Sequence, residues 1–530
     1  MSTLDLPGGT VRGTVHQGIH SFKGIPYAEP ITGRARWLPP VPRRPWEGVL
    51  DATRYGAACT QFKPLLLRVP FPPARARYLE AVAGLGALNE GDDCLVLNVW
   101  SKSLDRNARL PVMVWIHGGG FTGGGANETY DCAPFAAHDV VTVAIQYRLG
   151  PPGFLHGAGL FDGDFCGDNR AFQDQMLALK WVQENIERFG GDPGCVTLFG
   201  ESAGAFAIFQ LAASPQAKGL FRRAICMGGN ADTCAPAAEY HSLTREALAQ
   251  IGVKPGDEDA LASLDGAGLQ RLQQSASKAV FGGGDAARHG SLSRRKFSYM
   301  GAATGTAFLP AAPMSTYSSG TPNHVDLLLG TCANDGSLFS LVLPFRTLSA
   351  KMFSGRLAGY VPGNDMAALR AHYRARLPGL APLDIHERAN HDAFYRVPTL
   401  RAAEAHAAGH PGRTFHYQLD YPSAVAGLGA IHMIDVALLF RSTPIKRLLG
   451  SDAQTDALSA LLLDTWISFA KTGKPQAQGL PEWLPFGHAN RATMVFDRAT
   501  RLVRNLDAEL LAYWNGAGSP RPLQALRATA

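Results

Sequence analysis

Residues 196–209 read VTLFGESAGAFAIF, and this stretch does most to decide the fold and the chemistry of the chain. The apolar run before Gly200 is typical of a buried strand, and the run after Gly204 is typical of a helix. Ser202 lies between them in a G-x-S-x-G pattern, which is typical of a tight strand-to-helix turn that exposes the serine hydroxyl above a sheet. A chain with 58 glycines can match this pattern by chance, so the neighbouring sequence has to support it. With that support, Ser202 is interpreted as a nucleophile.

A second glycine-rich segment supplies the support. The apolar run at 111–116 leads directly into His117-Gly118-Gly119-Gly120-Phe121. Attack by a serine on a carbonyl group creates a tetrahedral oxyanion, which needs backbone N–H donors close by, and consecutive glycines let the main chain come that near. We expect Gly119, Gly120 and Ala203 to donate these hydrogen bonds. An isolated glycine triplet is more often a flexible turn, but the strand just before it favours the catalytic interpretation.

The composition excludes several other classes of protein. The chain has 530 residues, 46% of them hydrophobic, and its net charge of +6 arises from only 18% charged residues. No basic run is interleaved with aromatic residues, so we expect no nucleic-acid partner. No window reaches the roughly 18 apolar residues that a membrane span needs. The first ten residues lack a secretory signal pattern, which predicts a cytoplasmic protein, or a secreted one if a signal had been removed.

Metal and cofactor chemistry are not indicated. The eight cysteines form no C-x-x-C pair and have no histidine at metal-ligand spacing, so we expect no metal. Most of these cysteines are interpreted as small buried hydrophobic residues. Acyl transfer through a serine needs no organic cofactor, and none is expected.

Strand-like and helix-like segments alternate along the chain, which is typical of an α/β fold. The predicted strands lie at 111–116, 140–145, 196–199 and 325–329. The predicted helices lie at 172–186, where Gly190-Gly191-Asp192-Pro193 is expected to stop the helix, at 205–209 and at 458–470. No repeat or linker divides the chain, so we predict one domain over 1–530, with irregular, cap-like insertions above the sheet near 60–90 and 275–320.

In several long motifs the chain resembles the type-B carboxylesterase and cholinesterase family of α/β-hydrolases. The resemblance runs nearly end to end and covers FKGIPYA at 22–28, DCLVLNVW at 93–100, the block 169–193 with GESAG at 200–204, and segments 466–473 and 483–496. It implies an α/β-hydrolase fold with a large, mostly parallel sheet and insertions that form a gorge. It also implies a serine esterase that hydrolyses small-molecule carboxylic esters through an acyl-enzyme.

The resemblance assigns the remaining catalytic residues. The family's general base is a histidine in a late glycine-rich loop, and His432 ends such a loop at 427–432. The third member is commonly a glutamate in an acidic-Gly-Ser motif, where this chain has Asp335. Aspartate can hold the imidazole, but it is one methylene shorter than glutamate, so its loop must lie closer to His432. Asp435, three residues after His432, is left open as a competing acid.

Cys59 and Cys94 bracket a segment that resembles the family's disulfide-closed loop over the gorge, which implies a disulfide between them. In cholinesterases this loop supplies a tryptophan whose face binds a quaternary ammonium group. Here it contains Phe62, Phe71 and Tyr78 but no tryptophan, so a choline ester is disfavoured. The expected disulfide and the expected cytoplasmic location conflict, and the sequence leaves that conflict open.

The substrate pocket is expected to be apolar. The candidates to line it are Glu201, Phe121, Phe154, Phe308 and Phe339.

Two other functions remain open. An amidase or thioesterase could use the same triad, because the triad does not encode the leaving group. A non-catalytic binding protein is a weaker alternative, since such relatives lose the nucleophile or the oxyanion glycines and both are present here. The sequence does not predict the oligomeric state.

Overall fold

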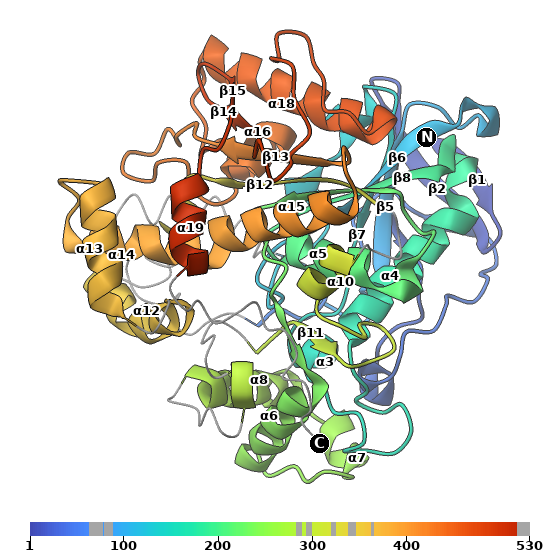
Figure 1. Cartoon of the computed structure of the whole chain (residues 1–530). Helices are drawn as coiled ribbons and strands as arrows, with labels where there is room; N and C mark the ends of the chain where they lie inside the picture. Colours follow the sequence, from blue (N-terminus) through green and yellow to red (C-terminus); the bar gives the residue numbers. More distant parts are fainter. Residues whose placement is uncertain are drawn as a thin grey trace.

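The structure, a computed structural model, describes residues 1–62, 78, 88–281, 289–292, 299–319, 325–337, 346–361 and 365–516. Its centre is a 13-stranded sheet in the order β1-β2-β3-β5-β7-β6-β8-β9-β12-β13-β14-β15, with β4 paired to β2 (Figure 1). The strands from β7 to β14 in this order run parallel, and β1, β2, β3, β5 and β15 pair antiparallel with their neighbours along it. The strands are β1 (Ser2–Leu6), β2 (Gly9–His16), β3 (Ile19–Pro26), β4 (Val49–Asp51), β5 (Val96–Ser101), β6 (Leu110–Ile116), β7 (Val141–Ile145), β8 (Gly191–Glu201), β9 (Arg223–Met227), β12 (Asp326–Cys332), β13 (Thr414–Leu419), β14 (Thr493–Phe496) and β15 (Arg501–Val503).

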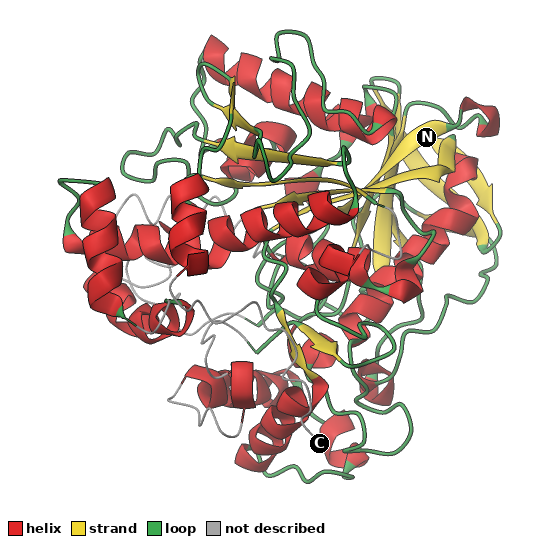
Figure 2. Cartoon of the chain, viewed as in Figure 1, coloured by secondary structure: helices red, strands yellow, loops and turns green. Residues whose placement is uncertain are grey.

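Helices cover both faces of this sheet (Figure 2). They are α2 (Ala133–Ala136), α3 (Gly150–Phe154), α4 (Arg170–Asn185), α5 (Ala203–Ala213), α6 (Ala237–Gln250), α7 (Glu258–Ala262), α8 (Gly266–Phe281), α10 (Pro313–Ser319), α12 (Arg346–Tyr360), α13 (Met366–Arg376), α14 (Pro382–His391), α15 (Val397–Gly409), α16 (Ile434–Phe440), α17 (Thr443–Lys446), α18 (Ala453–Thr472) and α19 (Ala508–Gly516). One π-helical turn, η10 (Asp392–Arg396), joins α14 to α15.

The period-two pattern of a strand divides the interior into two cores, one on each side of the sheet. On β6, Val112, Val114 and Ile116 face a core that includes residues of α4, α5 and α15. Met113 and Trp115 of the same strand face a second core with residues of α16 and α18. Both sides of the central strands are therefore buried, which explains their continuous apolar sequences.

The predicted strands and helices are all found, with bounds that differ by a few residues. The strands correspond to β6, β7, β8 and β12, and the helices to α4, α5 and α18. The segment 190–193 was expected to stop the helix, but α4 already ends at Asn185 and a 3₁₀ turn follows over Ile186–Phe189. Gly190, with φ +76°, ends the 3₁₀ turn, and Gly191 already pairs with Leu110 of β6.

The segment 275–320 was expected to be irregular, but its described parts are only partly so. This segment contains the end of α8, the strand β11 (Ala302–Thr304), which pairs with β10 (Cys234–Pro236), and α10. Ala276, Ala279 and Val280 recur at helical spacing and are buried, so apolar periodicity outweighs the glycine and serine content there. The helices α6, α7 and α8 form a group away from the sheet, at the bottom of Figure 1.

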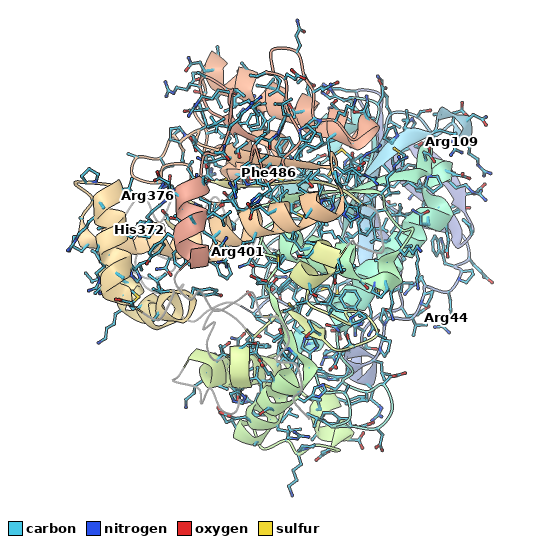
Figure 3. The ribbon with its side chains drawn as sticks, in the orientation of Figure 1. Arg44, Arg109, His372, Arg376, Arg401 and Phe486 are labelled. Atoms are coloured by element: carbon cyan, nitrogen blue, oxygen red, sulfur yellow. The ribbon has the colours of Figure 1, made fainter. Side chains whose placement is uncertain are left out.

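The C-terminal helix of the described chain, α19, holds α13 and α15 together. His372 of α13 stacks on Tyr513 with ring centroids 3.8 Å apart. Arg401 of α15 donates from Nε to the Asn515 side-chain oxygen at 2.9 Å (Figure 3). No helix within the described ranges has the length and apolar character that crossing a membrane requires.

The turn between β8 and α5 is tightly packed against the neighbouring strand. A Cβ atom at Gly200 would lie 2.7 Å from the carbonyl oxygen of Ile116, and one at Gly204 would overlap that same oxygen. The two glycines therefore allow β6, β8 and the first turn of α5 to meet.

We predict that Gly204→Ala lowers the free energy of unfolding by about 1–3 kcal/mol or more, because the added methyl group has no space. Chemical denaturation followed by circular dichroism measures the change. Gly266→Ala is the matched control, since nothing lies within 4 Å of the position where its Cβ would be. Equal stability of both variants would contradict the packing argument.

Candidate active site

Ser202 lies at the carboxyl end of the central parallel strand β8, directly before α5. Its backbone has φ +55° and ψ −122°, which is strained for a residue with a side chain. The Ser202 N–H donates to the carbonyl oxygen of Met227 at 2.9 Å, which ties the turn to β9. The neighbouring strands thus enforce the strained turn that the sequence predicts for this residue.

The structure brings His432 and Asp335 together, although they are far apart in the sequence. His432 Nδ1 lies 2.8 Å from Asp335 Oδ1, and both side chains are buried. A carboxylate only accepts, so Nδ1 carries the proton and donates it to Asp335. The other oxygen of Asp335, Oδ2, accepts from the Cys332 N–H at 2.9 Å, which fixes the orientation of the carboxylate.

The competing acid, Asp435, has different partners. Its Oδ2 accepts from the Tyr417 hydroxyl at 2.9 Å and its Oδ1 from the Val436 N–H at 2.9 Å. Burial and the charges of Glu201 and Asp335 raise the pKa of Asp435 to about 7. The contacts therefore pair His432 with Asp335 and not with Asp435.

The second ring nitrogen of His432 faces Glu201. His432 Nε2 lies 2.9 Å from Glu201 Oε1, but neither atom has an aligned hydrogen-bond partner among the described residues. Burial would lower the pKa of His432, but the carboxylates of Glu201 and Asp335 outweigh it and hold that pKa well above its usual value. Burial also raises the pKa of Glu201 and that of Asp335, while His432 opposes both shifts.

The glycine loop after β6 lies against the serine turn. A Cβ atom at Gly118 would lie 3.2 Å from the Cβ of Ser202. Gly119 and Gly120 have φ values of +111° and +62°, and Phe121 follows at +61°. Within the described residues, the N–H groups of Gly119, Gly120 and Ala203 donate no hydrogen bond to the protein. Backbone donors of this kind are what an oxyanion needs.

Side chains fix the peptide planes of this loop. His117 Nδ1 lies 2.8 Å from the Gly118 oxygen and donates to it, and the Tyr147 hydroxyl donates to the His117 oxygen at 2.8 Å. The Gly119 oxygen accepts from the N–H groups of Thr122 and Gly123, both at 3.1 Å. Because a trans peptide unit points its C=O and N–H in opposite directions, these bonds also set the directions of the Gly119 and Gly120 N–H groups.

Aromatic rings continue from this loop to the histidine. Phe121 packs on Phe154 with centroids 4.3 Å apart and on Phe206 at 6.2 Å. The π-helical turn η10 carries the rings onward, with Phe394 at 6.0 Å from Phe206 and Tyr395 at 5.1 Å from the His432 ring. A π-helical turn places these two side chains where a regular helix would not.

The remaining pocket candidates are placed less directly. Phe308 stacks on Phe172 at 5.0 Å, and Phe172 in turn lies 6.3 Å from Phe121, so Phe308 belongs to the same aromatic group but is one ring further away. Phe339 and Phe71 lie outside the described residues.

The two predicted disulfide partners are neighbours. The sulfur atoms of Cys59 and Cys94 lie 2.6 Å apart in the core, and both residues are free thiols in the structure. Their covalent bond stays a prediction. Between them, Tyr78 is buried and its hydroxyl donates to the His432 carbonyl oxygen at 3.4 Å. Tyr78 therefore contacts the loop that carries His432.

Sequence reasoning missed several residues that contact the site. Gly228, with φ +54°, lies where a Cβ atom would be 3.2 Å from the His432 ring and 3.4 Å from Asp335. The sequence feature that could have indicated Gly228 is the glycine pair directly after β9, because ligands bind at the carboxyl edge of parallel strands. Tyr395 and Asn334 carried no comparable local signal. No group of three or more metal-ligating side chains within the described ranges could hold a metal ion.

Comparisons with known proteins identify the family of the chain. The profile of the Carboxylesterase family matches residues 1–514. The chain is 32% identical over 512 residues to the para-nitrobenzyl esterase of Bacillus subtilis, covering 94% of this chain and 96% of the relative. It is 31% identical over 546 residues to carboxylesterase 4A of Bos taurus, covering 96% of this chain and 94% of the relative.

A solved structure confirms the expected α/β-hydrolase fold. The carboxylesterase EST55 of Geobacillus stearothermophilus superposes with a TM-score of 0.80 at 29% sequence identity, covering 97% of this chain and 100% of that chain. The relatives and the family also confirm a carboxylic ester hydrolase that acts on small-molecule esters through a serine. The predicted resemblance is correct, and the chain belongs to the carboxylesterase family.

Proposed function

We propose that this esterase hydrolyses neutral, apolar aryl and alkyl esters, with Ser202 as nucleophile, His432 as general base and Asp335 as the acid of the triad. The observation that carries the assignment is the buried contact of 2.8 Å between His432 Nδ1 and Asp335 Oδ1, close to the strained Ser202 turn. Gly119, Gly120 and Ala203 would hold the oxyanion through N–H groups that donate to no other group among the described residues.

The reaction proceeds in two acyl-transfer steps. The Ser202 oxygen attacks the ester carbonyl while His432 Nε2 takes its proton, and the same nitrogen then returns that proton to the leaving alcohol. Water attacks the acyl-enzyme along the same route and releases the acid. Asp335 holds the Nδ1–H tautomer throughout and stabilises the imidazolium.

Glu201 tunes the base in this proposal. Its carboxylate faces the proton-accepting nitrogen at 2.9 Å, so a protonated His432 is stabilised between two negative groups. The base is active only when it is neutral, and its raised pKa therefore requires a higher pH for activity.

The apolar substrate class rests on what surrounds the serine. Phe121, Phe206, Phe394 and Tyr395 form a run of neighbouring rings from the glycine loop to His432. The segment between Cys59 and Cys94 has no tryptophan to bind an ammonium group. The Bacillus subtilis relative acts, by its name, on para-nitrobenzyl esters, which are neutral and aromatic.

The nucleophile is tested by covalent labelling. A fluorophosphonate probe should modify the wild type on Ser202 and leave Ser202→Ala unmodified, because the proposal makes Ser202 the serine that His432 activates. Peptide mapping by mass spectrometry locates the adduct, and Ser214→Ala serves as a control that should label normally. An adduct on another serine would refute the assignment.

The pH dependence tests the role of Glu201. Glu201→Gln removes a negative charge beside His432, so the pKa of His432 should fall and the acid limb of kcat/KM should move to lower pH. Rates with a neutral ester across the acid range measure the shift. An acid limb that moves to higher pH would contradict the proposed electrostatics.

The substrate class is tested with matched esters. A desolvated cation over an aromatic face gains about 2 kcal/mol, roughly a factor of thirty in affinity, and this chain lacks the corresponding tryptophan. A phenyl or butyl ester should therefore be cleaved with a higher kcat/KM than the choline ester of the same acid. A clear preference for the choline ester would overturn the proposal, and the matched amide and thioester test the alternative leaving groups.

A further inference from the structure

The turn that carries Asp335 and the loop that carries His432 meet at Asn334. The backbone N–H of Asn334 donates to the Ala430 oxygen at 2.9 Å. In return, the Ala430 N–H donates to the side-chain oxygen Oδ1 of Asn334 at 3.2 Å. Asn334 also forms an isolated parallel bridge with Ile431, the residue before His432. One residue thus holds both polar backbone groups of Ala430.

The loop is shaped to receive the Asn334 side chain. Gly429 has φ +62°, and a Cβ atom there would lie 2.6 Å from Asn334 Oδ1. The missing side chain at Gly429 lets Asn334 reach past it to Ala430. The contact is therefore built from both sides, by an amide that reaches across and a glycine that leaves room for it.

The other anchors of the acid turn lead elsewhere. The Ala333 N–H donates to the Leu419 oxygen at 2.9 Å on β13, and Arg388 of α14 donates to the Ala333 oxygen at 3.2 Å. The Gly336 N–H donates to His391 Nδ1 at 3.3 Å, again on α14. These bonds hold the turn to the scaffold but do not fix its distance to the histidine loop.

We propose that Asn334 is a positioning residue that sets the distance between Asp335 and His432. Aspartate has a short side chain, so its carboxylate reaches the imidazole only if the two backbones are drawn together, and Asn334 draws them together. The inference rests on the proposed triad, and it assigns to Asn334 no contact with substrate.

The pH profile separates positioning from simple stability. The titratable groups that face His432 are Asp335, Glu201 from β8, His391 from α14, Tyr395 from η10 and Asp435 from α16. Loss of the Asn334 side-chain contact changes only the approach of Asp335. The Asp335 carboxylate helps to raise the pKa of His432. A greater distance between the two groups should therefore move the acid limb of kcat/KM to lower pH.

The test compares Asn334→Ala with Asn334→Asp. The alanine variant lacks the acceptor for the Ala430 N–H and should lose about fivefold to tenfold in kcat, as expected for one neutral hydrogen bond, with KM nearly unchanged. Its acid limb should move to lower pH. The aspartate variant keeps an acceptor oxygen and should retain kcat, and its added negative charge should not move the limb to lower pH.

A longer acid should compensate for the lost contact. The double variant Asn334→Ala with Asp335→Glu should be more active than Asn334→Ala alone, because glutamate reaches one methylene further. If Asn334→Ala does not fold, Gly429→Ala approaches the same contact from the other side and should shift the limb in the same direction.

An unchanged acid limb in a folded Asn334→Ala, or one without rescue by Asp335→Glu, would overturn the proposal. Asp335→Asn distinguishes this failure from failure of the triad. If Asp335→Asn stays active, the triad assignment is wrong. If Asp335→Asn is inactive while Asn334→Ala behaves like the wild type, only the positioning role is wrong.

Discussion

The contact between His432 and Asp335 constrains three separate parts of the chain. It requires the turn after β12, the loop before α16 and the serine turn after β8 to converge at the carboxyl edge of the parallel strands. A glycine or a hydrogen-bonding residue allows each close approach. Gly228 leaves room beside the imidazole, Gly204 lets α5 start against β6, and Asn334 joins the acid turn to the histidine loop. The sheet brings the three segments to one edge, and these three residues allow them to approach one another closely there.

The same contact explains the charges buried in the site. Isolated carboxylates are costly to bury, and here Glu201 and Asp335 both lie beside one imidazole that can carry the opposite charge. Both carboxylates raise the pKa of His432, and in the proposed mechanism they stabilise the imidazolium that forms when His432 takes the serine proton. The charges of Glu201 and Asp335 also raise the pKa of Asp435, but the oxygens of Asp435 accept hydrogen bonds from Tyr417 and Val436. In the proposed triad Asp335 positions His432 and Glu201 adjusts its pKa, while Asp435 bonds to Tyr417 and Val436 instead.

The features that could be predicted from the sequence are those with a short-range pattern. The strand before Ser202, the helix after it, the glycine loop at 118–120 and the alternation of helices and strands follow from periodicity and spacing. The helical order within 275–320 was missed because glycine and serine content was given more weight than buried alanine and valine spacing. The roles of Asn334 and of the π-helical turn at Tyr395 could not be predicted. Their partners, Ala430 and His432, lie far along the chain, and only the fold brings them together.

The most direct measurement is proton NMR of the histidine N–H that bonds to the acid. A proton held between His432 Nδ1 and a buried carboxylate at 2.8 Å should resonate far downfield of the backbone amides. The account predicts that this signal is present in the wild type and in Asp435→Asn and is lost in Asp335→Asn. A signal that survives in Asp335→Asn and disappears in Asp435→Asn would contradict the account.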